Sequence, residues 1–366
     1  MSSAEPLHVE RLKNKTARNG IWIFLFVVGM ALWLACLLKG GEAPRAWRAF
    51  LINFAYFTPI AGGMVVWSAV VRTSRGNWDG PLEGTAFSGI TFALPSFAAL
   101  IALWISSPQW APWFGRKDLP QGLWFQETFV FGRNLAALTI FWLLAMWYVA
   151  QRRRGGGKVL AGFLIFTYCM VFSLIGFDLI MALDPRWYSA LFGGYFFISG
   201  MYGAAAAWTV VSLRRPEADA NRLHDLGKLI VTFSLLTTYM MFSQLLPIWY
   251  GNLPAETRFV VPRMNFYPWA AVSIALLAVV YLGPLALLLT VRGKRTRWYL
   301  GTIALLILVG LWVERWWLVA PTFHRELKLG LTELSISAAY LGIFGFLLDR
   351  NVAGPQEGAG EEAKTI

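Results

Sequence analysis

The feature that most constrains the fold of this chain is a series of long apolar segments separated by short polar loops. A helix that spans a lipid bilayer needs about 20 mostly apolar residues. No segment alternates between apolar and polar residues with a period of two, so a transmembrane β-barrel is not expected. The sequence therefore predicts an all-α polytopic membrane protein with about ten transmembrane helices, at Gly20–Leu38, Ala46–Val71, Thr85–Ser106, Glu127–Ala150, Val159–Ala182, Tyr188–Val211, Leu226–Tyr250, Pro268–Val291, Trp298–Ala320 and Glu333–Leu348.

The composition argues against a soluble protein. Hydrophobic residues make up 57% of the 366 residues and charged residues only 14%, whereas soluble domains have about 25% charged residues. The net charge of +12 would suit a nucleic-acid-binding protein, but the basic residues form short clusters between the apolar segments, as membrane topology produces. We therefore expect membrane lipids, and no nucleic acid, among the partners.

The distribution of the 32 Lys and Arg residues predicts the orientation of the chain. Most of them lie in the two terminal tails and in the loops that follow the even-numbered spans, for example in the cluster at 152–158. Because basic residues favour the cytoplasmic side, both termini are expected in the cytoplasm. Residues 1–19 are expected to be a cytoplasmic tail without a cleavable signal peptide, residues 20–350 the membrane domain, and residues 351–366 a disordered cytoplasmic tail.

The sequence lacks the ligand patterns of common redox cofactors. Its three histidines are His8, His224 and His324, and none is predicted at the depth where a bis-His haem would need it. Its two cysteines, Cys36 and Cys169, cannot build an iron–sulfur or zinc site. No nucleotide-binding or metalloprotease motif is present. We therefore expect no haem, iron–sulfur cluster or metal bound by the chain itself.

Seven polar residues are predicted near the outer ends of the spans, and they form the main candidate site. A charged group at the bilayer centre costs about 2.5–3.5 kcal/mol on insertion scales, so such residues are normally paired or line a functional cavity. A proton path and a quinone pocket are both compatible with this cluster. The candidates are Asp178, Asp184, Gln244, Glu127, Arg133, Glu314 and Arg315.

Several of these residues have a structural alternative. Asp178 belongs either to a proton path or quinone pocket, or to an ion pair with Arg133 or Arg315. Glu314 and Arg315 are adjacent and project about 100° apart around a helix, which predicts separate partners for the two charges. The alternative for Arg315 is extension to the membrane interface. The alternative for Glu127 is stabilisation of a helix N-terminus.

A smaller polar group is predicted on the inner side of the membrane. His224, Asp225 and Lys228 lie together at the start of the seventh span. The simplest interpretation of His224 and Asp225 is a helix cap at the inner surface. The alternative is a point of proton uptake.

Two stretches of the sequence carry motifs that are more informative than composition alone. The first runs FDLIMALDPRWYS from Phe177 to Ser189 and continues as FGGYF at 192–196. The second combines HDLGKL at 224–229, FSQ at 242–244 and WYGNLPAE at 249–256. Both resemble the F subunit of alternative complex III, a bacterial quinol:electron-acceptor oxidoreductase. That subunit is similar to the membrane subunits of polysulfide reductase and of nitrite-reductase-associated quinol dehydrogenases.

The resemblance implies a fold, a location and partners. It implies two four-helix bundles, at 46–182 and 188–320, with peripheral first and last spans, in the bacterial cytoplasmic (inner) membrane. The implied partners are a paralogous quinol-binding membrane subunit, an iron–sulfur subunit of molybdopterin-enzyme type and c-type haem subunits. The resemblance leaves open whether menaquinone or another quinone binds in this chain or only in its paralogue.

The function expected from the resemblance is that of a haem-free membrane subunit of a quinol:cytochrome c oxidoreductase complex. Such a subunit contributes to quinol binding, to proton conduction or to both, and to assembly of the complex, and is not expected to be catalytic alone. Two alternatives from other classes stay open. One is a stand-alone secondary transporter or proton channel, and the other is a purely structural anchor.

Overall fold

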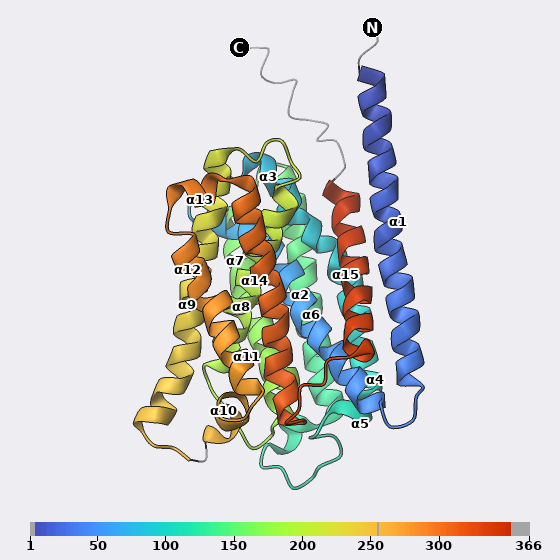
Figure 1. Ribbon diagram of the computed structural model, residues 1–366, viewed down its shortest axis with the longest axis vertical. Coiled ribbons are helices and arrows are strands. Elements are labelled where there is room, and N and C mark those ends of the chain that lie inside the picture. The colour runs from blue at the N-terminus through green and yellow to red at the C-terminus, as the bar shows by residue number, and fades with distance from the viewer. Residues whose placement is uncertain (1–3, 255, 353–366) are drawn as a thin grey trace.

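The computed structural model describes residues 4–254 and 256–352, and this part of the chain consists of helices and loops without a strand (Figure 1). Nine of its helical segments are long and apolar enough to cross a membrane, which confirms the expectation of an all-helical, multi-pass membrane protein. The long helices are α1 (Ala4–Leu37), α2 (Ala43–Thr73), α4 (Ala93–Ile105), α6 (Glu127–Arg153), α7 (Lys158–Ile175), α8 (Phe192–Ser212), α9 (Ala220–Tyr250), α14 (Arg297–Val319) and α15 (Leu331–Val352).

Several spans are built from more than one helical piece. The third span consists of α3 (Gly80–Phe87), a 3₁₀ turn η1 (Ser88–Phe92) and α4. The fifth span continues from α7 into a π-helical turn, η3 (Gly176–Ile180). The eighth span consists of α11 (Trp269–Leu276), a second π-helical turn, η5 (Leu277–Leu282), and α12 (Gly283–Leu287). Short π-helical turns often occur at functional sites, and both of these lie beside buried polar groups.

The remaining elements are short and connect the spans. They are α5 (Ser107–Trp110), η2 (Gly122–Phe125), η4 (Met181–Leu183), α10 (Thr257–Met264), α13 (Val291–Arg295) and η6 (Ala320–Thr322).

The sixth expected span, Tyr188–Val211, is the helix α8, which is not among the nine segments that meet the criteria of length and hydropathy. Its 21 residues correspond to about 30 Å of helix at 1.5 Å per residue, which is enough to cross the hydrocarbon core. Glycines, tyrosines and a tryptophan lower its mean hydropathy. Nearly all of its side chains are buried, so this helix packs against protein rather than lipid.

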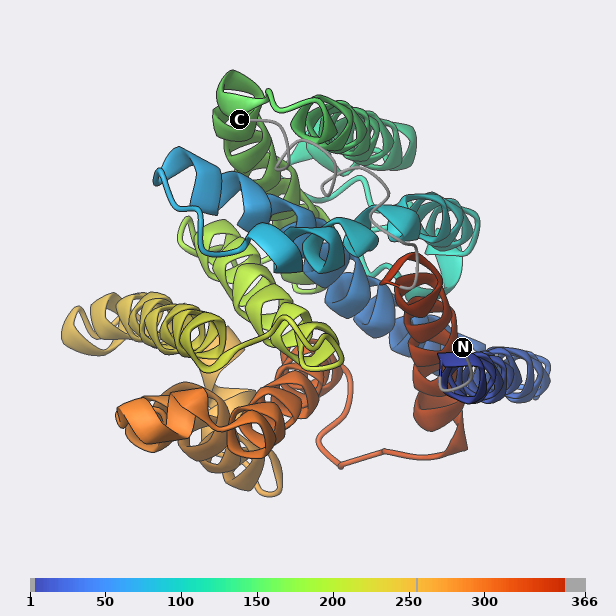
Figure 2. The ribbon, with the colours of Figure 1, turned by 90° about the horizontal axis from the view of Figure 1, so that it is seen from above.

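The helices form two groups of four and a peripheral pair, as Figure 2 shows from above. Helices α2, α3–α4, α6 and α7 pack together, and helices α8, α9, α11–α12 and α14 form the second group. Helices α1 and α15 pair along their length beside α2. We call the end where α2, α6 and α8 finish the basic end, and the end that holds α5 and α10 the opposite end (Figure 1).

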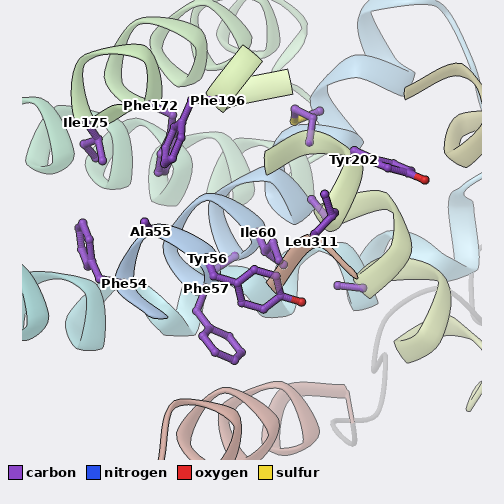
Figure 3. Packing of buried hydrophobic residues seen from close by; sticks show 14 of the residues in the cluster. Phe54, Ala55, Tyr56, Phe57, Ile60, Phe172, Ile175, Phe196, Tyr202 and Leu311 are labelled. Atoms are coloured by element: carbon purple, nitrogen blue, oxygen red, sulfur yellow. The ribbon is translucent and has the colours of Figure 1, made fainter. Parts of the chain in front are cut away.

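Helix α2 joins the two groups. Its side chains from Ala49 to Ala69 are buried without interruption, so it has no face for lipid. Figure 3 shows its aromatic and aliphatic side chains among those of α7, α8 and α14. Gly63 permits the close approach of α8, because a Cβ there would lie 2.7 Å from the Cβ of Ala204.

The ends of the chain differ in part from the expected tails. Helix α1 begins at Ala4, so most of the expected tail 1–19 is the first part of that helix. The expected disordered tail, 351–366, lies almost wholly outside the described residues. The starts of α1 and α14 and the end of α15 lie on the same side of the molecule, at the basic end (Figure 1).

The tight contact between η1 and α2 gives a first prediction. A methyl group at Gly89 would lie 2.2 Å from the carbonyl oxygen of Ala61, so we expect Gly89→Ala to lower the free energy of unfolding by about 1–3 kcal/mol. The measurement is thermal melting of the purified protein in detergent. The control is Gly132→Ala in α6, where a Cβ meets nothing within 4 Å. Equal melting temperatures for the two variants would contradict this packing.

Candidate functional site

Asp178 is fully buried, in the π-helical turn that follows α7. Arg133 of α6 binds its carboxylate with two nitrogens, Nη2 to Oδ1 at 2.6 Å and Nε to Oδ2 at 2.7 Å. Asn134 donates to Oδ2 at 2.6 Å and Trp124 donates to Oδ1 at 3.2 Å. The carboxylate therefore accepts four hydrogen bonds, which uses the usual capacity of its two oxygens.

The guanidinium of Arg133 has contacts besides those with Asp178. Its guanidinium lies 3.8 Å from the ring centroid of Trp124 and donates to the carbonyl oxygen of that residue at 3.0 Å. Of the two arginines left open as partners of Asp178, the structure thus selects Arg133. This saturated pair ties α6 to the end of α7, and it leaves no free acceptor on Asp178 for a ligand.

Glu314 and Arg315 contradict the expectation that each needs a separate partner. Arg315 donates from Nη1 to Oε2 of Glu314 at 3.0 Å, and both side chains are buried. The side chain of Arg315 is long enough to turn back around the helix, which offsets the angle between adjacent positions. Its Nη2 also binds the hydroxyl of Ser199 on α8. Arg315 therefore stays inside the bundle and does not extend to the surface.

Two buried tyrosines complete the cluster around Glu314. Tyr195 of α8 donates to Oε1 of Glu314, and the hydroxyl of Tyr281 lies 3.3 Å from the same oxygen. The two tyrosine hydroxyls are 2.9 Å apart. The sequence analysis missed both residues, because a tyrosine in a membrane span usually indicates an interface anchor. Their only sequence signal is a position far from the span ends.

Beside Tyr281 lies a cavity of about 370 Å³ between α9 and the α11–η5 segment. Its lining is mainly apolar, and Thr238, Ser273 and Tyr281 contribute the hydroxyl groups. Ile274 and Leu277, which also line it, are 69% and 48% exposed, so the cavity lies toward the lipid-facing side of the bundle. Tyr281 thus separates this cavity from the Glu314–Arg315 pair.

A buried arginine lies beside this cavity, at the opposite end of the molecule. Arg263 of α10 donates to the carbonyl oxygens of Trp317 and Leu318 at 3.1 and 2.6 Å, at the negative end of the α14 dipole. Burial lowers the pKa of Arg263 to about 9, and the charge of Asp184 opposes this shift. The sequence analysis assigned Arg263 to a loop, and the signal that it is buried comes only from the fold.

The other outer candidates do not join either cluster. Asp184 forms an ion pair with Arg258 at 2.8 Å near the surface of the opposite end. Glu127 begins α6 and accepts a hydrogen bond from Ser107 at 3.1 Å. Gln244 lines a small pocket next to the cavity and bonds weakly to its own helix at 3.4 Å. The seven candidates therefore lie in separate groups rather than in one site.

The inner candidates form a local surface group at the start of α9. Asp225 and Lys228 pair with each other at 2.7 Å, one turn apart. His224 is partly buried, and its Nδ1 has no hydrogen-bond partner within the described chain. The expected helix cap is supplied by Asp219 instead, which accepts from the amides of Asn221 and Arg222.

The described residues contain no group of three or more His, Cys, Asp or Glu side chains that could hold a metal ion. In comparisons with known proteins, the chain matches no family model and no curated protein sequence. The chemistry of the site is therefore argued from its own geometry.

The Asp178–Arg133 pair gives a second prediction. Asp178→Asn leaves a buried guanidinium without its counter-charge, and breaking such a pair costs about 3–5 kcal/mol. We expect a large fall in melting temperature and in the yield of folded protein. The control is Asp184→Asn, whose partner Arg258 is half-exposed, and which should change stability by about 1 kcal/mol or less. A melting temperature unaffected by Asp178→Asn would contradict a structural role for the pair.

Proposed function

We propose that the chain is a haem-free membrane subunit of a bacterial quinol-oxidising electron-transfer complex, and that it binds a quinol in the cavity beside Tyr281. The observation that carries the proposal is the contact between this apolar cavity and a buried acid. Tyr281 lines the cavity and its hydroxyl lies 3.3 Å from Glu314.

The cavity suits the ring of an isoprenoid quinol. Its volume of about 370 Å³ falls in the range of about 300–1,000 Å³ that small-molecule sites occupy. Apolar side chains surround three hydroxyl groups, which matches a flat hydrophobic ring that carries two oxygens. The exposed positions of Ile274 and Leu277 leave a route from the lipid phase, in which such a ligand dissolves.

The groups behind Tyr281 can accept a proton. A quinol gives up two electrons and two protons when it is oxidised, and a general base must lie within about 3 Å of the hydroxyl or act through one intermediate group. Tyr281 and Tyr195 connect the cavity wall to Glu314 by hydrogen bonds. Arg315 donates to the other carboxylate oxygen of Glu314 at 3.0 Å. This chain thereby supplies the proton acceptor.

In this proposal electrons leave through other subunits, because two cysteines are too few for an iron–sulfur cluster and the histidines lie near the ends of helices. The proposed partners are the paralogous membrane subunit, the iron–sulfur subunit and the c-type haem subunits named above. The excess of basic residues places the basic end in the cytoplasm by the positive-inside rule. The proposed cavity and Glu314 then lie in the outer half of the inner membrane.

Binding of a quinone analogue tests the cavity directly. The purified chain in lipid nanodiscs is titrated with menadione, and quenching of tryptophan fluorescence is measured. We expect Leu277→Trp to fill the cavity and weaken binding at least tenfold. Tyr281→Phe should weaken it by about 2–10-fold, the effect of one lost hydrogen bond.

A matched control comes from a second cavity of about 370 Å³ between α1, α4 and α15, which Leu94 lines. Leu94→Trp should leave menadione binding unchanged. Equal loss in both tryptophan variants, or no binding by the natural chain, would contradict the proposal. The second result would favour a transporter, a channel or a structural anchor.

Gentle purification of a tagged copy tests the partner assignment separately. The expected result is co-purification of iron–sulfur and c-haem subunits, identified by mass spectrometry and by the visible absorption spectrum. A colourless chain that purifies alone from a membrane containing these subunits would contradict membership of such a complex. Proton flux in vesicles would then test for a stand-alone channel.

A further inference from the structure

Asp79 is a buried carboxylate at the basic end whose arrangement the proposed quinol site does not explain. It is the residue before α3 and is fully buried. An aspartate at this position usually accepts a hydrogen bond from an amide of the first helical turn. Asp219 does so at the start of α9, but the side chain of Asp79 makes no such capping bond.

The carboxylate of Asp79 lacks a hydrogen-bond partner. Within the described chain, neither of its oxygens has a donor in hydrogen-bonding geometry. A buried ionised carboxylate without partners is strongly unfavourable, and such groups normally take up a proton instead. Burial raises the pKa of Asp79, while Arg72 and the nearby amides of Asp79 and Gly80 oppose the shift.

Glu83 lies one helical turn after Asp79, and its amide donates to the carbonyl oxygen of Asp79 at 3.1 Å. Side chains at this spacing share a helix face. Glu83 is 13% exposed and so lies closer to water than Asp79. Its Oε1 accepts from Ser68 and from Arg152, each at 2.8 Å. Arg152 therefore pairs with Glu83 and not with Asp79.

Most other groups around Asp79 have partners of their own, although within the described residues Nε of Arg72 makes no hydrogen bond. Arg72 of α2 donates to Asn77 at 2.7 Å and lies 3.9 Å from Glu83. Tyr148 of α6 bonds to Ser68 at 2.9 Å. Arg222 of α9 donates to the carbonyl oxygen of Trp78 at 3.2 Å.

Within the described residues, helices α8 and α15 place no unpaired charged side chain beside Asp79. Helix α8 meets α3 through Trp208 and Ser212, which bond to Leu82 and Thr85. Arg214, which follows α8, is held by Asp349 of α15. Asp79 thus lies behind the Glu83 ion pairs, where Arg72 and two backbone amides offset only part of the cost of burying a negative charge.

We infer that Asp79 and Glu83 form a proton-binding site at the basic end, in which Asp79 takes up a proton and Glu83 exchanges it with water. In uptake, an O–H bond of hydronium breaks as one forms on Glu83, and that bond then breaks as one forms on Asp79. No electron moves in either transfer. The site stands independently of the proposed quinol cavity, because it uses different helices and no quinone.

Infrared spectroscopy of the purified chain in lipid tests this site. A protonated carboxyl group gives a C=O stretching band distinct from that of a carboxylate, and the band is followed from pH 4 to pH 9. We expect a band that persists above the ordinary pKa of aspartate, about 3.9, and that is lost in Asp79→Asn. Asp219→Asn, which changes an exposed capping aspartate, should retain it. No such band in the natural chain, or a band of equal intensity in the natural chain and in Asp79→Asn, would overturn the inference.

Thermal melting provides a second readout, in which folding itself is the signal. A folded-state pKa above the unfolded value means that the folded chain binds more protons between the two values, so stability falls as pH rises through that window and then levels off. Asp79→Asn should remove this dependence and melt at the same or a higher temperature at pH 7. A lower melting temperature for Asp79→Asn at pH 7 would show that Asp79 is ionised and paired, and would overturn the inference.

Discussion

The arrangement of this protein depends on one constraint, which is that charged and polar groups inside a bilayer must find their partners within the protein. The buried charges meet it in two ways. Asp178 and Arg133 form hydrogen bonds with each other and with neighbouring side chains. Their ion pair therefore links α6 to the end of α7. Glu314 and Arg315 also pair, but two tyrosines extend their hydrogen bonds toward a cavity. The Asp178–Arg133 cluster thus has no acceptor left for a ligand, whereas the Glu314–Arg315 cluster is connected to a cavity by hydrogen bonds.

The two π-helical turns explain how polar groups reach these positions. A π-helical turn adds a residue to the helix and rotates the side chains that follow. One turn contains Asp178 and the other contains Tyr281. The turn with Asp178 is mostly buried in protein, where neighbouring helices can satisfy irregular backbone, whereas Leu277, Val279 and Leu282 of the other turn are exposed. The bundle can accommodate these turns because α2, buried on every side, holds its two halves in register.

Much of the fold follows from the sequence, because hydropathy and segment length are local properties. Helix α8 was also predicted, at Tyr188–Val211, although its glycines and tyrosines give it a lower hydropathy than the nine other segments. The site was less predictable, since pairing depends on which helices meet. Glu314 and Arg315 were wrongly given separate partners, and Tyr195, Tyr281, Arg263 and Asp79 were missed. Tyr195 lies in the FGGYF segment that carries the resemblance, whereas the other three have an ordinary sequence context and only their burial reveals them.

The pairing of α1 with α15 has a consequence for biosynthesis. Gly342 lies against the backbone of Trp22 and Phe26, and Asp349 binds Arg18. Helix α1 therefore packs mainly against α15, which is synthesised more than 290 residues later, and it has far fewer contacts with α2. During translation α1 must stay in the lipid without its main partner until α15 has been inserted. A nascent chain that stops before α15 leaves α1 without that partner.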